Sequence, residues 1–315
     1  MKVMNIRRIL GVMAVAMVFY FVIIVLSDID EVADAFRLFD WVYLIPVMIL
    51  IMANYLVRAE RWHSFLQGID LGIPRARSYW LFLAGLSMSI TPAKAGEALK
   101  ALLLRMERGA PFERGIAVVF AERMTDLTGV LFLVGIGFIV FPYGLLPFSI
   151  VVAVVVAILL TLSVPRTSER FVSFLKSRRL LKKLGTVVER ALTDARNLLA
   201  GRNLAMGTSF GFIAWGAECV AFYLILVACS SDIGLMECVF VYSFASVVGA
   251  VSMMPGGMGT TEATMIALLL MLSVDASAAS FAVILVRVCT LWFAVGLGII
   301  MLMAYSKRSK VAVEA

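Results

Sequence analysis

The chain has 315 residues, of which 62% are apolar and 16% charged, with a mean hydropathy of +1.00 and a net charge of +7. Charged residues this sparse cannot cover the surface of a water-soluble protein of this size, so the composition excludes a soluble globule and indicates an integral membrane protein. No nucleic-acid-binding motif accompanies the positive charge, so we expect no nucleic-acid partner.

Six segments have the length and apolarity of membrane-spanning helices, each near the roughly 20 residues that cross a hydrocarbon core of about 30 Å. They run over residues 9–27, 41–57, 115–141, 148–164, 204–229 and 277–303. Basic residues precede the first segment, but it lacks the cleavage pattern of a secretory signal, and we interpret it as an uncleaved anchor. Two further apolar stretches, 78–108 and 238–272, are interrupted, and we interpret them as paired half-helices or re-entrant hairpins.

One short pattern occurs in both interrupted stretches. A serine is followed by helix-breaking residues and, ten residues later, by a glutamate: Ser87, Pro92, Gly96 and Glu97 in the first stretch, and Ser252, Pro255, Gly256, Gly257, Gly259 and Glu262 in the second. The next hydrophobic segment carries one embedded arginine, Arg123 or Arg287, 26 or 25 residues after the glutamate. Duplicated helix breakers and charges predict a transporter built from two repeats, here 41–141 and 204–303.

The distribution of charge predicts the orientation of the spans. Residues 165–202 hold ten lysines or arginines against three acids, so the positive-inside rule places this segment and both termini in the cytoplasm. Between 204 and 303 the only basic residue is Arg287 and the short connections are acidic, so we expect these connections outside. The stretch 238–272 then enters from outside and 78–108 from the cytoplasm, which makes the two copies an inverted repeat.

The basic segment 165–202 has two interpretations. Its apolar residues recur at roughly helical spacing, which suits a helix lying at an anionic cytoplasmic leaflet. A basic loop that only fixes the topology is the alternative.

Ionisable residues within the predicted spans are candidate functional residues. A charged side chain at the bilayer centre costs about 2.5–3.5 kcal/mol on insertion scales. Glu122, Arg123 and Asp126 share one face of a predicted helix, while Glu218 and Arg287 lie inside later spans. In the alternative interpretation these charges pair with one another and only hold the helices together.

The interrupted stretches supply candidates of a second kind. Pro92 and Pro255 lack an amide donor, and the glycines near them permit backbone conformations that other residues resist. Helices that restart at about residues 96 and 260 expose amides at their N-termini, which is typical of an anion site. Glu97 and Glu262 lie in the first turns of these helices, where they either cap the amides or act in gating or proton coupling.

Signals of enzymatic chemistry are weak. The single histidine, His63, lies at the predicted end of a span, where an interfacial position without a partner is the simplest interpretation. The four cysteines, at 219, 229, 238 and 289, lack the spacing of a metal site. We therefore expect no enzymatic activity, no cofactor and no bound metal.

Four motifs in this order resemble the lysylphosphatidylglycerol synthase transmembrane, or flippase-like, family. They are Arg58-Ala-Glu-Arg61-Trp62, Ser89-Ile-Thr91-Pro92-Ala-Lys94-Ala-Gly96-Glu97, Glu122-Arg123-Met124-Thr-Asp126-Leu127 and Pro255-Gly256-Gly257-Met-Gly259-Thr-Thr-Glu262. The chain departs from the family at Lys94, where many members have arginine, and no soluble aminoacyl-transfer or glycosyltransferase domain is recognisable. The resemblance covers nearly the whole chain and implies movement of lipids with modified or glycosylated head groups.

The sequence therefore predicts an all-α polytopic membrane protein in the cell membrane, with residues 1–315 forming a single transmembrane domain. We expect a lipid flippase in which the lipid phosphate passes the two interrupted stretches, Arg123 and Arg287. Lys94 and Arg58 or Arg61 would collect the head group at the cytoplasmic mouth. The acids would neutralise the arginines of the empty site: Glu97, Glu122, Asp126, Glu218 and Glu262.

Two other functions remain open at this stage. One is a secondary transporter of a small soluble anion, and the other is a membrane enzyme that acts on lipid phosphates. The expected partners are membrane lipids with anionic head groups, a separate lipid-modifying synthase or glycosyltransferase, and a second copy of the chain in a homo-oligomer.

Overall fold

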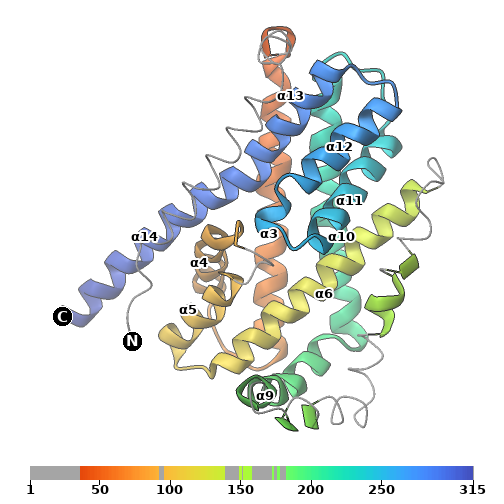
Figure 1. The fold of residues 1–315 in the computed structure, drawn as a ribbon. Helices are drawn as coiled ribbons and strands as arrows, with labels where there is room; N and C mark the ends of the chain where they lie inside the picture. The colour runs from red at the N-terminus through yellow and green to blue at the C-terminus, as the bar shows by residue number, and fades with distance from the viewer. Residues whose placement is uncertain are drawn as a thin grey trace.

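The computed structural model describes residues 36–91, 96–138, 149–150, 152–157, 172–173, 176–177 and 182–314. Within these residues every regular element is a helix and no strand occurs (Figure 1). The expected span 9–27 and most of the expected span 148–164 lie outside the described residues, as do Pro92 and Lys94.

Three helices among the described residues are long and apolar enough to cross a membrane: Trp41–Gly68, Gly201–Ala228 and Ala276–Tyr305. The first joins a short 3-10 helix, η1 (Trp41–Tyr43), to α3 (Leu44–Gly68), and the second is α10 (Gly201–Ala228). The third combines α13 (Ala276–Arg287), a π-helical turn η5 (Val288–Trp292) and the first part of α14 (Phe293–Glu314). A fourth long helix, α6 (Phe112–Gly137), carries more charged residues.

The helix that contains the predicted span 41–57 is longer than that span, because α3 continues to Gly68. The charged residues beyond 57 do not end the helix, since they are satisfied inside the molecule. Arg58 and Arg61 both form ion pairs with Asp126 of α6.

Both interrupted stretches are broken helices. In the first, α4 (Arg75–Gly85) and the 3-10 turn η2 (Leu86–Met88) precede α5 (Ala98–Arg108). In the second, α11 (Leu235–Val251) leads through the 3-10 turn η4 (Pro255–Gly257) to α12 (Thr260–Met271). We call residues 86–91 the first turn and residues 252–259 the second turn.

The two turns meet at the centre of the molecule, and their broken helices reach it from opposite ends (Figure 1). Ile90 of the first turn and Met258 of the second are buried in one apolar cluster with Val295 of α14. A Cβ atom built on Gly256 would lie 3.7 Å from the Cα of Ile90, so the two backbones are close neighbours.

Glycines set the distances between the long helices. A Cβ on Gly129 of α6 would lie 2.6 Å from the backbone nitrogen of Phe212, and one on Gly211 of α10 would lie 2.6 Å from the carbonyl oxygen of Thr125. Because these residues have no side chain, α6 and α10 can approach closely, and the charged face of α6 lies next to α10.

The described part of the basic segment 165–202 includes a helix, α9 (Lys182–Leu198), that packs on α6. Ala191 and Ala195 contact Ala117 in a small apolar cluster, and Arg114 Nε lies 2.9 Å from Asp194 Oδ2. The segment is therefore not only a loop, while its contact with a lipid leaflet stays a prediction.

The close contact of α14 with the first turn predicts opposite effects at two glycines of the same helix. A Cβ on Gly298 would lie 2.1 Å from the backbone nitrogen of Ser87, whereas a Cβ on Gly296 would have no neighbour within 4 Å. Gly298→Ala should lower the free energy of unfolding by about 1–3 kcal/mol, because backbone atoms must move to admit the methyl group. The measurement is the thermal unfolding midpoint in detergent.

The matched control is Gly296→Ala, which should leave the midpoint unchanged or raise it, since alanine favours a helix over glycine by about 0.5–1 kcal/mol. Equal midpoints for the two variants would contradict the packing of the first turn on α14.

Candidate functional site

A cavity of about 400 Å³ lies where the two turns meet, between α3, α6, α10, α11 and the helix that carries Arg287. Its charged lining residues are Arg58, Arg123, Asp126, Glu218 and Arg287. Ser89 of the first turn and Gly256 and Gly257 of the second also line it. The cavity therefore brings together residues from both predicted repeats.

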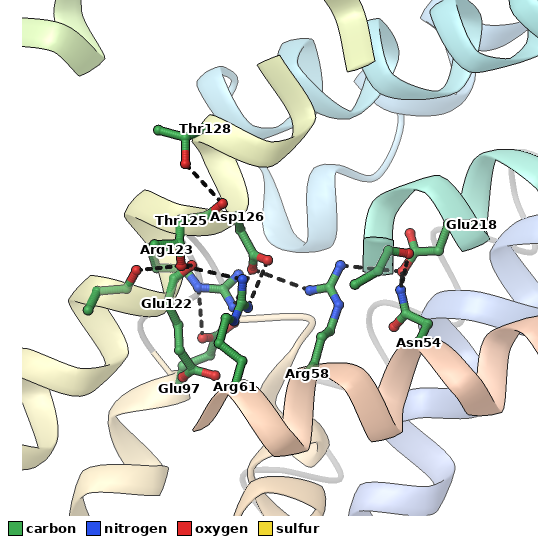
Figure 2. Close-up of polar contacts among 12 residues, drawn as sticks. Asn54, Arg58, Arg61, Glu97, Glu122, Arg123, Thr125, Asp126, Thr128 and Glu218 are labelled. Atoms are coloured by element: carbon green, nitrogen blue, oxygen red, sulfur yellow. Dashed lines mark hydrogen bonds and ion pairs between the residues drawn. The ribbon is translucent and has the colours of Figure 1, made fainter. Parts of the chain in front are cut away.

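Asp126 is the centre of the charged network on α6 (Figure 2). Its Oδ2 lies 2.8 Å from Arg123 Nη2 and 3.3 Å from Arg58 Nη1, and its Oδ1 lies 2.8 Å from Arg61 Nη2. Arg123 also places Nε 3.2 Å from Glu97 Oε2, which ties α6 to the start of α5. The Asp126 carboxylate thus pairs with three arginines, and Glu97 pairs with one of these, Arg123.

Arg58 links this network to the second half of the chain. Its Nη2 lies 3.4 Å from Glu218 Oε1 of α10, and its guanidinium lies 4.9 Å from the centre of the Trp215 ring. Asn54 Nδ2 and the Tyr242 hydroxyl donate hydrogen bonds to Glu218 at 2.9 and 2.7 Å. Glu218 of α10 is therefore bound by Asn54 and Arg58 of α3 and by Tyr242 of α11.

Glu122 belongs to a different pair than its position beside Arg123 suggests. Its Oε2 lies 2.5 Å from Lys100 Nζ, and Lys100 lies over the rings of Trp62 and Phe82 at 5.0 and 5.1 Å. Neither Glu122 nor Lys100 lines the cavity. The prediction that Glu122 shares one face with Arg123 and Asp126 is wrong, since Glu122 points from α6 toward α5, whereas Arg123 and Asp126 do pair.

Arg287 binds the second turn directly. Its Nε lies 2.7 Å from Glu262 Oε1, and its Nη2 donates a hydrogen bond of 2.6 Å to the carbonyl oxygen of Gly256. Gly256, Gly257 and Gly259 have φ angles of 61°, 68° and 83°, which non-glycine residues rarely adopt. The glycines that interrupt the helix thus create the turn whose carbonyl receives the arginine.

The two halves of the chain contain the same ion pair. In each, the glutamate at the start of the helix after the turn pairs with the arginine of a following helix: Glu97 with Arg123, and Glu262 with Arg287. Glu97 makes no side-chain cap for α5, and the N-cap of α12 is Gly259. Pairing with arginine, rather than helix capping, is therefore the observed role of both carboxylates.

The predicted position of Arg61 at a cytoplasmic mouth is wrong. Its side chain is 0% exposed, because it points from α3 toward Thr125 and Asp126. Arg58 lines the cavity instead.

Gly96 packs directly against the first turn. It donates its backbone N–H to Thr91 Oγ1 at 2.7 Å, and a Cβ there would lie 2.7 Å from the Cβ of Met88, so a larger residue would not fit.

Several residues of the site escaped sequence reasoning. Asn54 and Tyr242 contact Glu218, and the Tyr55 hydroxyl donates a 2.7 Å hydrogen bond to the carbonyl oxygen of Thr290 in the π-helical turn. Short π-helical turns often mark functional sites because they free backbone carbonyls. The only signal for Asn54 in the sequence is a polar residue in an apolar run, one helical turn before Arg58.

Positive and negative charges balance within the network. Arg58, Arg61, Lys100 and Arg123 face Glu97, Glu122, Asp126 and Glu218, and Arg287 faces Glu262. Among the described residues, no three side chains of the metal-binding types lie together, and the four cysteines are free thiols. Within the part of the chain that the structure describes, the network is therefore neutral, with arginine side chains at the cavity wall.

Comparison with known proteins agrees with this architecture. The family description of the lysylphosphatidylglycerol synthase transmembrane region matches residues 9–298. The chain belongs to this family. The resemblance seen in the four sequence motifs is thereby confirmed, and the family is one of membrane proteins linked to lipid handling.

Membrane proteins of archaea are among the proteins similar to this chain. A UPF0104 membrane protein of Methanothermobacter thermautotrophicus is 26% identical over 316 aligned positions, which cover 92% of each chain. A UPF0104 membrane protein of Pyrococcus horikoshii is 22% identical over 296 positions, which cover 84% of this chain and 88% of the relative.

The ion pairs predict which double substitutions are coupled. Arg123→Ala with Glu97→Gln should lose less stability than the sum of the single losses, by about 0.5–3 kcal/mol, because each single change removes one partner of a buried charge. Arg123→Ala with Glu122→Gln should be closer to additive, since Lys100 holds Glu122. Thermal unfolding of all variants in detergent gives both couplings.

Equal coupling in the two cycles would contradict this assignment of partners. A larger coupling with Glu122 than with Glu97 would show that Glu122, and not Glu97, is a partner of Arg123.

Proposed function

We propose that this protein is a flippase that moves an anionic, phosphate-containing lipid across the cell membrane, with a head group that is glycosylated, aminoacylated or unmodified. The observation that carries the proposal is the cavity at the meeting point of the two turns, whose wall presents Arg58, Arg123 and Arg287. Arginine binds phosphate through two parallel hydrogen bonds, so an anionic head group in this cavity can take the place of the carboxylates that pair with these arginines.

The proposed topology follows the sequence prediction. Six full spans and two broken hairpins form one domain over residues 1–315, with an inverted repeat of 41–141 and 204–303 and both termini in the cytoplasm. Support comes from the broken helices, which approach the centre from opposite ends (Figure 1), and from the matching pairs Glu97–Arg123 and Glu262–Arg287.

In the proposed mechanism the carboxylates act as internal counterions. They neutralise the arginines while the cavity is empty, and a lipid phosphate then replaces Glu97 or Asp126 at Arg123 and Glu262 at Arg287. Arg123 is the most exposed of the three cavity arginines at 24% of its side chain, compared with 12% for Arg58 and 10% for Arg287. The head group would therefore meet Arg123 first.

A lipid substrate fits the cavity better than a small soluble anion, because apolar residues of α6 and α11 line it beside the charges. We propose no enzymatic activity for this chain. Its proposed partners are anionic membrane lipids, together with a separate synthase or glycosyltransferase that modifies them, and a second copy of the chain in a homo-oligomer.

Removal of the positive charge at Arg287 tests this function. In liposomes that contain trace fluorescent phosphatidylglycerol, Arg287→Gln should abolish movement of the lipid between leaflets, measured as protection from a membrane-impermeant quencher. Arg287→Lys should retain weak activity, because it keeps the charge but loses the bidentate geometry.

The matched control is Arg75→Gln, which removes an exposed arginine that pairs with Glu60; neither residue lines the cavity, so the rate should be unchanged. A wild-type rate for correctly inserted Arg287→Gln would show that Arg287 is structural and that the proposed phosphate path is wrong.

A further inference from the structure

The cavity has a polar wall and an apolar wall on the same helices. On α6, Arg123 and Asp126 line the cavity. Asp126 pairs with Arg123 and also with Arg58 of α3, so this polar side of α6 faces α3. Met124, Leu127 and Val130 also line the cavity and follow one another at three-residue spacing. Leu127 lies one helical turn beyond Arg123 and Val130 one turn beyond Asp126, so these apolar residues continue the charged face along the helix, while Met124 is turned about 100° from Arg123.

The facing helix repeats the arrangement. On α11, Tyr242 and Ser246 lie one helical turn apart on the polar side, and the hydrogen bond from Tyr242 to Glu218 fixes that side toward α10. Ala250 lines the cavity one turn beyond Ser246 in the same row, and Val247 lines it one helical position further round. These apolar residues of α6 and α11 therefore line one cavity together with the charged network.

α6 and α11 pack closely at one end, and the part of the cavity that they line together, called the gap below, has exposed residues at its other end. They are tightly packed at Gly137 and Phe240, where a Cβ on the glycine would lie 2.6 Å from the Cβ of the phenylalanine. Val130 and Val247 still share one apolar cluster. Beyond them the α11 wall becomes exposed: Val247 is 6% exposed, while Met254 and Met253 in the second turn are 40% and 70% exposed.

We infer that the hydrocarbon chain of the transported lipid lies in this gap between α6 and α11, against Met124, Leu127, Ala250 and Met254, while its phosphate lies at the arginines. The inference rests on the proposed function and adds the path of the chain. The gap is continuous with the charged site within one cavity, and its outer wall is exposed apolar surface. An amphiphile whose head group is bound at the arginines thus keeps its chain in apolar surroundings.

Blocking the gap tests the inference. Ala250→Trp places an indole in the gap and should slow movement of phosphatidylglycerol at least about tenfold in the liposome assay. The matched control is Val251→Trp, since Val251 is 64% exposed and does not line the cavity. This control should keep the wild-type rate.

Photochemical labelling gives an independent readout that does not depend on transport. Phosphatidylglycerol with a diazirine in one acyl chain, present in trace amounts in phosphatidylcholine vesicles, should label Met124, Leu127 or Met254, and excess unlabelled phosphatidylglycerol should suppress this labelling. Ile49 of α3, which is 63% exposed, serves as the reference for bulk lipid and should be labelled without such competition.

The outcomes separate the inference from the function on which it rests. Two results together would overturn the inference and leave the flippase intact. Ala250→Trp would move phosphatidylglycerol at the wild-type rate, and excess unlabelled phosphatidylglycerol would suppress labelling of the gap no more than labelling of Ile49. Transport of soluble glycerol phosphate without movement of phosphatidylglycerol would overturn both.

Discussion

Charged side chains buried among apolar helices must be neutralised where they lie, because no water is present to solvate them. This constraint determines the centre of the protein. Asp126 holds three arginines, Glu218 holds one of them from the other half of the chain, and Glu262 holds Arg287. Removal of one member of such a pair costs about 3–5 kcal/mol, so the network fixes the positions of the helices that carry it.

The same network explains why the helices are broken. An arginine in a regular helix bundle finds no free backbone acceptor, whereas the second turn offers the carbonyl oxygen of Gly256 to Arg287. Glycines with positive φ angles make this turn, and Gly298 of α14 leaves the space in which the first turn packs. The second turn thus places polar backbone next to Arg287, at a cavity that joins both halves of the chain.

Much of this arrangement was predictable from the sequence, because it depends on local spacing. The duplicated breakers located both broken helices, and the separation of 26 or 25 residues from glutamate to arginine recurs in two ion pairs. The choice of partners was not predictable. Glu122 and Arg123 are neighbours in the chain but point about 100° apart, so only the packing of α5 against α6 shows that Glu122 belongs to Lys100. The buried position of Arg61 depends in the same way on where Asp126 lies.

The central claim is that the arginines of the cavity bind a lipid phosphate, and lipid that stays bound during purification tests it most directly. Native mass spectrometry of the wild-type protein from detergent should detect a retained phosphate-containing lipid, identified after its release by fragmentation. The Arg123→Gln, Arg287→Gln double variant should lose this lipid, while Arg75→Gln should keep it. Retention of the same phosphate-containing lipid by the double variant, at the level of the wild type, would contradict the account.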